Sequence, residues 1–266
     1  MNETLTRTLS GIVYIVILIS ATLYSNSFLL LFGALLLLLV LEFCDLVQLQ
    51  KIIPLGIAAL TYFWFSYFNS TREIDLLLLI ISLFTAVKAM VLLFGKGQNK
   101  VDSASKYIYL LGYIIFPVIL ITKLPYATGI FTPSIIISIF VLIWINDTMA
   151  YVVGKTIGKH KLFERISPKK TMEGFVGGVV FSMLFSILIA YYFIQQPIIY
   201  WVIIATIVGV FGTIGDLVES KLKRLANVKD SGKIMPGHGG ILDRLDSIIF
   251  VGPFVFLFYQ IIAYVS

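Results

Sequence analysis

The sequence predicts an all-α polytopic integral membrane protein, and its composition and hydropathy lead to this fold class. Of the 266 residues, 59% are hydrophobic and 13% are charged, whereas soluble domains carry roughly 25% charged residues. The mean hydropathy is +0.99, and the apolar residues form runs that could cross a bilayer as helices. The formal charge of +6 does not indicate a nucleic-acid partner, because the basic residues lie between these runs.

The apolar runs predict about nine transmembrane helices. They cover approximately residues 11–24, 27–43, 52–68, 75–94, 106–122, 130–151, 174–194, 198–216 and 248–265. Several are shorter than the roughly 20 residues that an upright span requires. The first two could therefore form a tight hairpin or lie partly in the interface.

The distribution of Lys and Arg predicts the orientation. With a cytoplasmic amino terminus, seventeen bases fall in the inner segments and only Arg72 and Lys123 fall outside. Cytoplasmic loops carry the excess of basic residues, so we expect the amino terminus inside and the carboxyl terminus outside. Lys88 falls within a span, where a base is a functional candidate, although we favour snorkelling or pairing with an interior acid as the interpretation.

Two acids of the amino-terminal half, Glu42 and Asp45, lie close to Lys51 in the sequence. We interpret this group as a solvated helix end rather than as a set of metal ligands.

The first informative polar block follows the apolar run that ends at Asp147. Ser167 suits the cap position of the next helix and Pro168 its first turn. Lys169 and Lys170 would then lie at a helix amino terminus, which attracts anions. A positively charged loop followed by a well-capped helix explains the same residues without a site.

The second polar block, residues 216–247, holds five of the fourteen acids, six of the twenty Lys and Arg residues and one of the two histidines. If the preceding helix continues through Asp216, then Ser220, Lys223 and Arg224 share one of its faces. The glycine-rich run at 236–240 permits backbone conformations in which N–H groups converge on an anion. Acids, bases and such a turn together suit a divalent metal and phosphates.

The last helix is predicted to open with two acids, Asp243 and Asp246, which lie three residues apart on neighbouring parts of one face. Acids in a first helical turn are also favoured by the helix dipole alone. His238 lies between glycines, and no second histidine or cysteine stands at ligand spacing from it. It therefore suits the role of a hydrogen-bond donor to phosphate, or of a general acid, better than that of a metal ligand.

The second block resembles the signature of the phosphatidate cytidylyltransferases, also called CDP-diacylglycerol synthases. The polar and glycine positions that match are Ser220, Lys223, Arg224, Lys229, Asp230, Gly232, His238, Gly239, Gly240, Asp243, Arg244 and Asp246. Met235 stands where the family usually has Leu, Ile or Phe. The first block is also similar to this family through Asp147, Ala150 and Tyr151 and through the run from Ser167 to Gly174, although Met149 replaces an expected small residue. The resemblance covers about 100 residues, from 147 to 247.

This resemblance implies a nucleotidyltransferase of phospholipid biosynthesis in the cell (inner, cytoplasmic) membrane. It would join CTP and phosphatidic acid, giving CDP-diacylglycerol and pyrophosphate. The implied partners are these substrates and membrane lipid, with no nucleic acid, and a homodimer is a further expectation. The implied cofactor is Mg²⁺ or another divalent cation, and a second cation is left open.

The resemblance also suggests roles for individual residues. We expect Asp216 and Asp243 to bind the metal, with Asp147 or Asp246 as a further ligand. The expected catalytic set is Asp216, Asp243, Lys223, Arg224, His238 and Asp246. The expected substrate-binding set is Ser167, Lys169, Lys170, Thr171, Glu173, Ser220, Lys229, Asp230, Gly239, Gly240 and Arg244.

We therefore expect residues 1–128 to form amino-terminal transmembrane helices and residues 129–266 a catalytic region with cytoplasmic loops at 152–173 and 217–247. The active site would lie at the cytoplasmic membrane edge. A CTP-dependent lipid or polyprenol kinase remains an alternative with related chemistry. A membrane transporter is a weaker one, because paired broken helices in two repeats are not evident.

Overall fold

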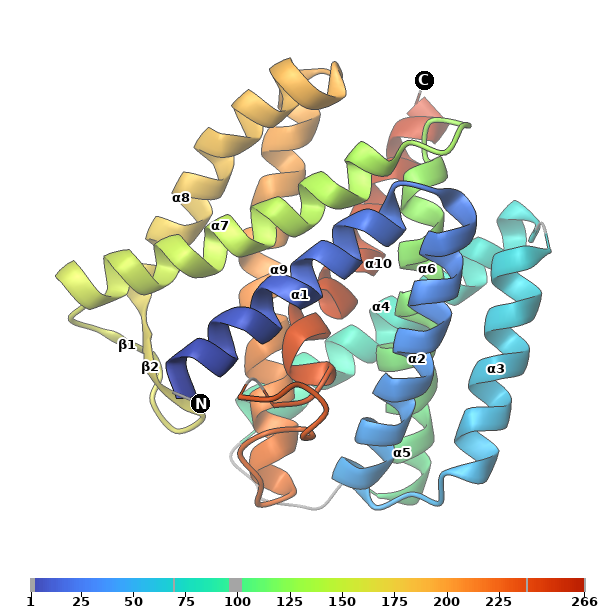
Figure 1. Cartoon of the computed structure of the whole chain (residues 1–266), viewed down its shortest axis with the longest axis horizontal. Coiled ribbons are helices and arrows are strands. Elements are labelled where there is room, and N and C mark those ends of the chain that lie inside the picture. The colour runs from blue at the N-terminus through green and yellow to red at the C-terminus, as the bar shows by residue number, and fades with distance from the viewer. Residues whose placement is uncertain (1–2, 69, 96–101, 238, 266) are drawn as a thin grey trace.

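The computed structural model describes residues 3–68, 70–95, 102–237 and 239–265, and it consists of packed helices with one small hairpin (Figure 1). The amino-terminal elements are α1 (Glu3–Thr22), α2 (Ser25–Val47), α3 (Ile52–Tyr67), α4 (Arg72–Phe94), α5 (Ser103–Tyr109), the π-helical η1 (Leu110–Ile115), α6 (Phe116–Lys123) and the 3₁₀ turn η2 (Leu124–Tyr126). The carboxyl-terminal elements are α7 (Pro133–Ile157), β1 (Lys161–Phe163), β2 (Ser167–Thr171), α8 (Met172–Ile189), the π-helical η3 (Ala190–Ile194), α9 (Ile198–Leu225) and α10 (Leu242–Val265).

The predicted all-α polytopic fold is confirmed. Seven helical segments in the described ranges are long and apolar enough to cross a membrane, and α5 through η2 form one of them. Two shorter apolar helical stretches, Arg7–Thr22 and Ile52–Tyr67, match the two remaining predicted runs. Large apolar side chains on the outside, such as Leu30, Leu60 and Val91, are about two-thirds or more exposed to the surroundings. This outer surface suits lipid rather than water.

The helices extend further at their polar ends than the apolar runs indicate. α9 continues without a break past Asp216 to Leu225, and α10 begins at Leu242, ahead of the apolar run at 248–265 and just before Asp243, where the last helix was expected to open. The polar residues of the second block are therefore held on rigid helical extensions. A hydropathy pattern identifies the part of a helix that lies in lipid, and it does not show how far the helix continues beyond the lipid.

The expected start of α8 is wrong. Ser167 and Pro168 belong to β2, which pairs with β1 in an antiparallel hairpin. α8 begins at Met172, and Thr171 is its cap, because the Thr171 hydroxyl accepts a hydrogen bond from Gly174 N at 3.1 Å. A Ser-Pro pair fits both the first turn of a helix and an edge strand, and the hydroxyl of Thr171 determines the outcome.

Two charged groups of the amino-terminal half are satisfied locally. Lys88 Nζ donates to Ser105 Oγ at 2.6 Å and lies 5.7 Å from the centre of the Tyr109 ring. Lys51 pairs with Asp45 at 2.6 Å, and both side chains are exposed. The interpretation of Asp45 and Lys51 as a solvated helix end is confirmed.

The four carboxyl-terminal helices pack closely. α8 lies against α7 and α9, and α9 lies against α10. Small residues permit these approaches: a Cβ added to Gly178 on α8 would lie 2.8 Å from the carbonyl oxygen of Asn146 on α7. α1 crosses in front of α9 and α10 and runs beside α7 (Figure 1). The polar extensions of α7, α9 and α10 consequently meet at one place.

Candidate active site

A cavity of about 790 Å³ lies where these polar extensions meet. Its walls come from α7, β2, the start of α8, the carboxyl-terminal part of α9 and the first turns of α10. The predicted site residues that line it are Asp147, Lys169, Lys170, Thr171, Asp216, Lys223, Asp230, Asp243, Arg244 and Asp246. Two polar blocks that are separated in the sequence thus contribute to a single charged space.

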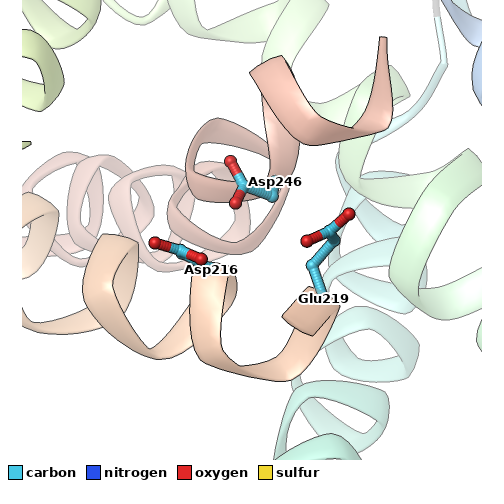
Figure 2. A group of neighbouring side chains, drawn as sticks. All are labelled: Asp216, Glu219 and Asp246. Atoms are coloured by element: carbon cyan, nitrogen blue, oxygen red, sulfur yellow. The ribbon is translucent and has the colours of Figure 1, made fainter. Parts of the chain in front are cut away.

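Three carboxylates gather in this cavity, namely Asp216 and Glu219 of α9 and Asp246 of α10. Figure 2 shows their carboxyl groups pointing toward one another, and one oxygen from each lies within 4.8 Å of the others. Glu219 is fully buried and Asp246 is 9% exposed. Like charges this close repel each other strongly unless a cation or a proton compensates them. Hard oxygen ligands at this spacing suit a divalent cation.

Two lysines compensate part of this charge. Lys170 of β2 forms an ion pair with Asp216. Lys223 lies between two acids, with its Nζ 2.5 Å from Glu219 Oε2 and 2.6 Å from Asp243 Oδ1, and its side chain is 12% exposed. Both bases were expected to contact phosphate, and in this structure they contact carboxylates.

Asp243 occupies a different place from the three clustered acids. Its Oδ2 accepts hydrogen bonds from Ser231 N at 2.9 Å, Ser231 Oγ at 3.0 Å and Gly240 N at 2.7 Å. The carboxylate therefore holds the glycine-rich loop against the start of α10. Asp216 and Asp243 were expected to bind the metal, with Asp147 or Asp246 as a further ligand, whereas the structure brings Asp216 together with Glu219 and Asp246. Asp147 faces the same cavity from α7.

The loop itself has the backbone conformation that its glycines predicted. Gly237 and Gly239 have φ values of +77° and +88°, which favour glycine. A Cβ added to Gly239 would lie 2.5 Å from Asp243 Oδ2. Gly239 thus adopts one of the backbone conformations that the glycine-rich run permits. His238 lies outside the described residues.

Glu42 of α2 is a residue of this site that the sequence analysis missed. Its side chain is buried, with 4% of the residue exposed. Its carboxylate accepts hydrogen bonds from Ser231 Oγ at 3.0 Å, Ile241 N at 2.9 Å and Leu242 N at 2.8 Å. The interpretation of Glu42 as part of a solvated helix end is wrong, because this acid caps the first turn of α10. An isolated acid following a long apolar run was the available signal.

The remaining predicted residues lie around the cavity rather than on its walls, within the described ranges. Ser220 Oγ donates to Asp216 Oδ1 at 3.3 Å. Arg224 Nη1 donates to the carbonyl oxygen of Val228 at 3.4 Å, beyond the end of α9. Glu173 accepts hydrogen bonds from the backbone N–H groups of residues 159 and 160 and lies 2.6 Å from His160 Nδ1. Ser167 is half-buried in β2, and Lys229 is exposed.

Comparison with known proteins identifies the family of this chain. The model of the cytidylyltransferase family matches residues 5–262. The phosphatidate cytidylyltransferase of Bacillus subtilis (strain 168) is 52% identical over 119 residues, which are 44% of this chain and 44% of that protein. The enzyme of the same name from Staphylococcus saprophyticus is 53% identical over 116 residues, 43% of this chain and 44% of that protein.

The corresponding protein of Staphylococcus aureus (strain COL) is 50% identical over 116 residues, again 44% of its length. The alignments thus span less than half the length of the curated relatives, whereas the family match spans nearly all of this chain. On the strength of that match, this chain belongs to the cytidylyltransferase family.

Proposed function

We propose that this protein transfers the cytidylyl group of CTP to phosphatidic acid, giving CDP-diacylglycerol and pyrophosphate. The observation that carries the proposal is a single large cavity, at the ends of membrane-spanning helices, that combines clustered carboxylates with Lys and Arg side chains. The printed names of the curated relatives support the same reaction. The bacterial relatives and the long apolar helices support the cell membrane as its location.

The residues suit the chemistry of this reaction. A phosphate oxygen of the lipid attacks the α-phosphorus of CTP, the bond to the bridging oxygen breaks, and pyrophosphate leaves. The attacking oxygen is already anionic, so no strong general base is required. The obstacle is the repulsion between two highly charged anions, which positioned cations reduce. Lys169, Lys170, Lys223 and Arg244 line the cavity and are the residues proposed to bind the phosphates.

The clustered acids fit a divalent cation, Mg²⁺ by the chemistry of the ligands. Both carboxylate oxygens of Glu219 are buried, and within the described ranges Oε1 has no hydrogen-bond partner while Oε2 lies 2.5 Å from Lys223 Nζ. Asp216, Glu219 and Asp246 would hold the cation, which would neutralise and orient phosphate groups when bound. Asp243, which lines the same cavity and pairs with Lys223, is proposed as a further residue that would face the cation.

The position of the label in CTP distinguishes this proposal from its alternatives. Purified protein is incubated with phosphatidic acid and with CTP labelled on either the α- or the γ-phosphate, with and without Mg²⁺. Cytidylyl transfer places the α-label in the lipid and requires the divalent cation. The γ-label in the lipid would identify a CTP-dependent kinase and contradict the proposal. Absence of both labels from the lipid would also contradict it and would favour transport.

Substitution of the β2 lysines tests their proposed contact with phosphate. Lys169→Ala is expected to raise the apparent KM for CTP or phosphatidic acid by about tenfold, equal to about 1.4 kcal/mol. Lys170→Ala should lower kcat as well, because it also removes the partner of Asp216. Steady-state kinetics in both substrates measure these effects. Lys159→Ala, an exposed lysine of the same loop, is the control. Unchanged kinetics in both variants would contradict a phosphate contact. The basic residues of the hairpin would then serve only to set the orientation of the protein in the membrane.

Gly239→Val is expected to abolish most activity although it removes no charge and no hydrogen-bond donor. Valine at a φ of +88° is strained by about 1–3 kcal/mol, and its Cβ would displace the Asp243 carboxylate. Gly129→Val is the matched control, because Gly129 has a φ of +87° and nothing lies within 4 Å of an added Cβ. Turnover and thermal stability are measured for both. Equal activities in the two variants would mean that the loop only connects two helices.

A further inference from the structure

A second cavity, of about 250 Å³, lies between α1, α7 and α10. One part of its wall is apolar and comes from Ile15 of α1, from Phe140, Ile143 and Trp144 of α7, and from Ile248 of α10. We refer to this space as the α1 slot. These residues offer mainly hydrocarbon and aromatic surface, which suits an apolar group better than a charged one.

The other end of the α1 slot is polar and reaches the candidate active site. Asp147, Asp243, Arg244, Asp246 and Ser247 line both cavities. The side chains of α10 thus separate a charged space on one side from an apolar space on the other. A molecule that occupies both spaces would place a charged group in the larger cavity and an apolar part in the α1 slot. The two parts would meet beside Arg244, which lines both spaces.

The apolar wall on α1 is continuous with the outer, lipid-facing surface of that helix. Ile15 is 37% exposed, and its neighbours Val13, Val16 and Ile17 are 55%, 56% and 51% exposed. α1 crosses in front of α10 and runs beside α7 (Figure 1), and these are the two other helices of the slot. The slot therefore lies between the lipid phase and the clustered acids.

We propose that the α1 slot takes the glycerol backbone and the first acyl carbons of the lipid substrate, with the lipid phosphate at Arg244 and the nucleotide in the larger cavity. This inference rests on the proposed function and adds a separate subsite for the apolar substrate. An acyl chain that moves from the bilayer into an apolar slot exchanges one hydrocarbon environment for another, which costs little. A phosphate that reaches the Arg244 side chain gains charge-assisted contacts.

Narrowing the slot tests this assignment. Ile15→Trp places a larger side chain on the α1 wall, and Ile17→Trp is the matched control, because it makes the same change on the exposed face of the same helix. Ile15→Trp is expected to raise the apparent KM for long-chain phosphatidic acid in mixed micelles by about tenfold. The KM for CTP should stay as in the wild type. Ile17→Trp should change neither value.

Photo-crosslinking supplies a second measurement that does not depend on turnover. Phosphatidic acid with a diazirine close to the carboxyl end of an acyl chain is irradiated with the wild-type protein, and labelled residues are mapped by mass spectrometry. Labelling within residues 11–15 and 140–144 that excess phosphatidic acid suppresses, and excess phosphatidylcholine does not, supports the subsite. Label spread over the outer helix faces and insensitive to competition would overturn it.

The two measurements also separate this inference from the proposed function. If wild-type protein makes no α-labelled lipid, the proposed function fails, and the crosslinking still reports whether a phospholipid enters the slot. If wild-type protein makes the product while Ile15→Trp matches Ile17→Trp in lipid kinetics, the slot is not the lipid subsite. If Ile15→Trp does not fold, the crosslinking of the wild-type protein alone decides whether the α1 slot binds the lipid.

Discussion

Asp216→Asn is expected to reduce turnover by more than about a hundredfold, equal to about 2.7 kcal/mol of barrier. The substitution preserves the shape of the side chain and the fold of α9, but it removes the charge that pairs with Lys170 and that faces Glu219 and Asp246. Initial rates with α-labelled CTP measure the effect on turnover. Mn²⁺ binding followed by electron paramagnetic resonance should weaken by at least about tenfold in the absence of substrates.

Asp45→Asn is the control for this variant, because Asp45 is also a carboxylate paired with a lysine, at 2.6 Å from Lys51, but on an exposed surface. It should leave both turnover and Mn²⁺ binding unchanged. An Asp216→Asn protein that keeps more than about a tenth of wild-type activity, a barrier change below about 1.4 kcal/mol, would show that Asp216 is not a metal ligand.

Glu42→Gln is expected to have the second-largest effect, although this residue lies in the apolar amino-terminal half. Both oxygens of Glu42 accept hydrogen bonds, Oε1 from Ile241 N and Oε2 from Leu242 N and Ser231 Oγ. An amide presents an NH₂ group to one of these donors in either orientation. A buried donor left without an acceptor costs about 1–3 kcal/mol, so the first turn of α10 and the loop at 231–241 should loosen.

Tryptic cleavage after Lys229 and Lys233 measures the loosening of the loop, and initial rates measure its effect on turnover. We expect faster cleavage and at least about a tenfold lower rate. Glu42→Asp keeps the charge with a shorter side chain and should fall between the wild type and Glu42→Gln. Wild-type cleavage and wild-type rate in Glu42→Gln would mean that the loop holds its shape without this cap.

The sequence was sufficient for those features that depend on local pattern. Apolar runs locate the helices, and residues spaced along one helix face place Asp216 above Ser220 and Lys223 on α9. Glycine positions predict the left-handed backbone at Gly239. The division at residue 128, the orientation in the membrane and the roles of the site residues stay predictions.

Features that depend on long-range contacts could not be predicted in the same way. A lysine in a polar segment attracts carboxylates and phosphates alike. The positive charge of Lys223 therefore does not by itself show that this side chain lies between Glu219 and Asp243. Glu219 was not among the expected metal ligands, because its burial follows from the packing of α10 against α9. The partners of Glu42 are separated from it by 189 to 200 residues, beyond the reach of any periodic pattern.

The cap by Glu42 joins two segments that the ribosome makes at different times. The ribosome completes α2 long before it makes Ser231, Ile241 and Leu242, the three residues that satisfy the carboxylate. Until then Glu42 is an acid at the end of an inserted helix without its native donors, which is unfavourable away from water. The arrival of the last helix removes this defect and shapes the glycine-rich loop in the same step. We therefore expect chains that stop before residue 231 to be recognised by membrane quality control as unfinished, and active protein to appear only after synthesis ends.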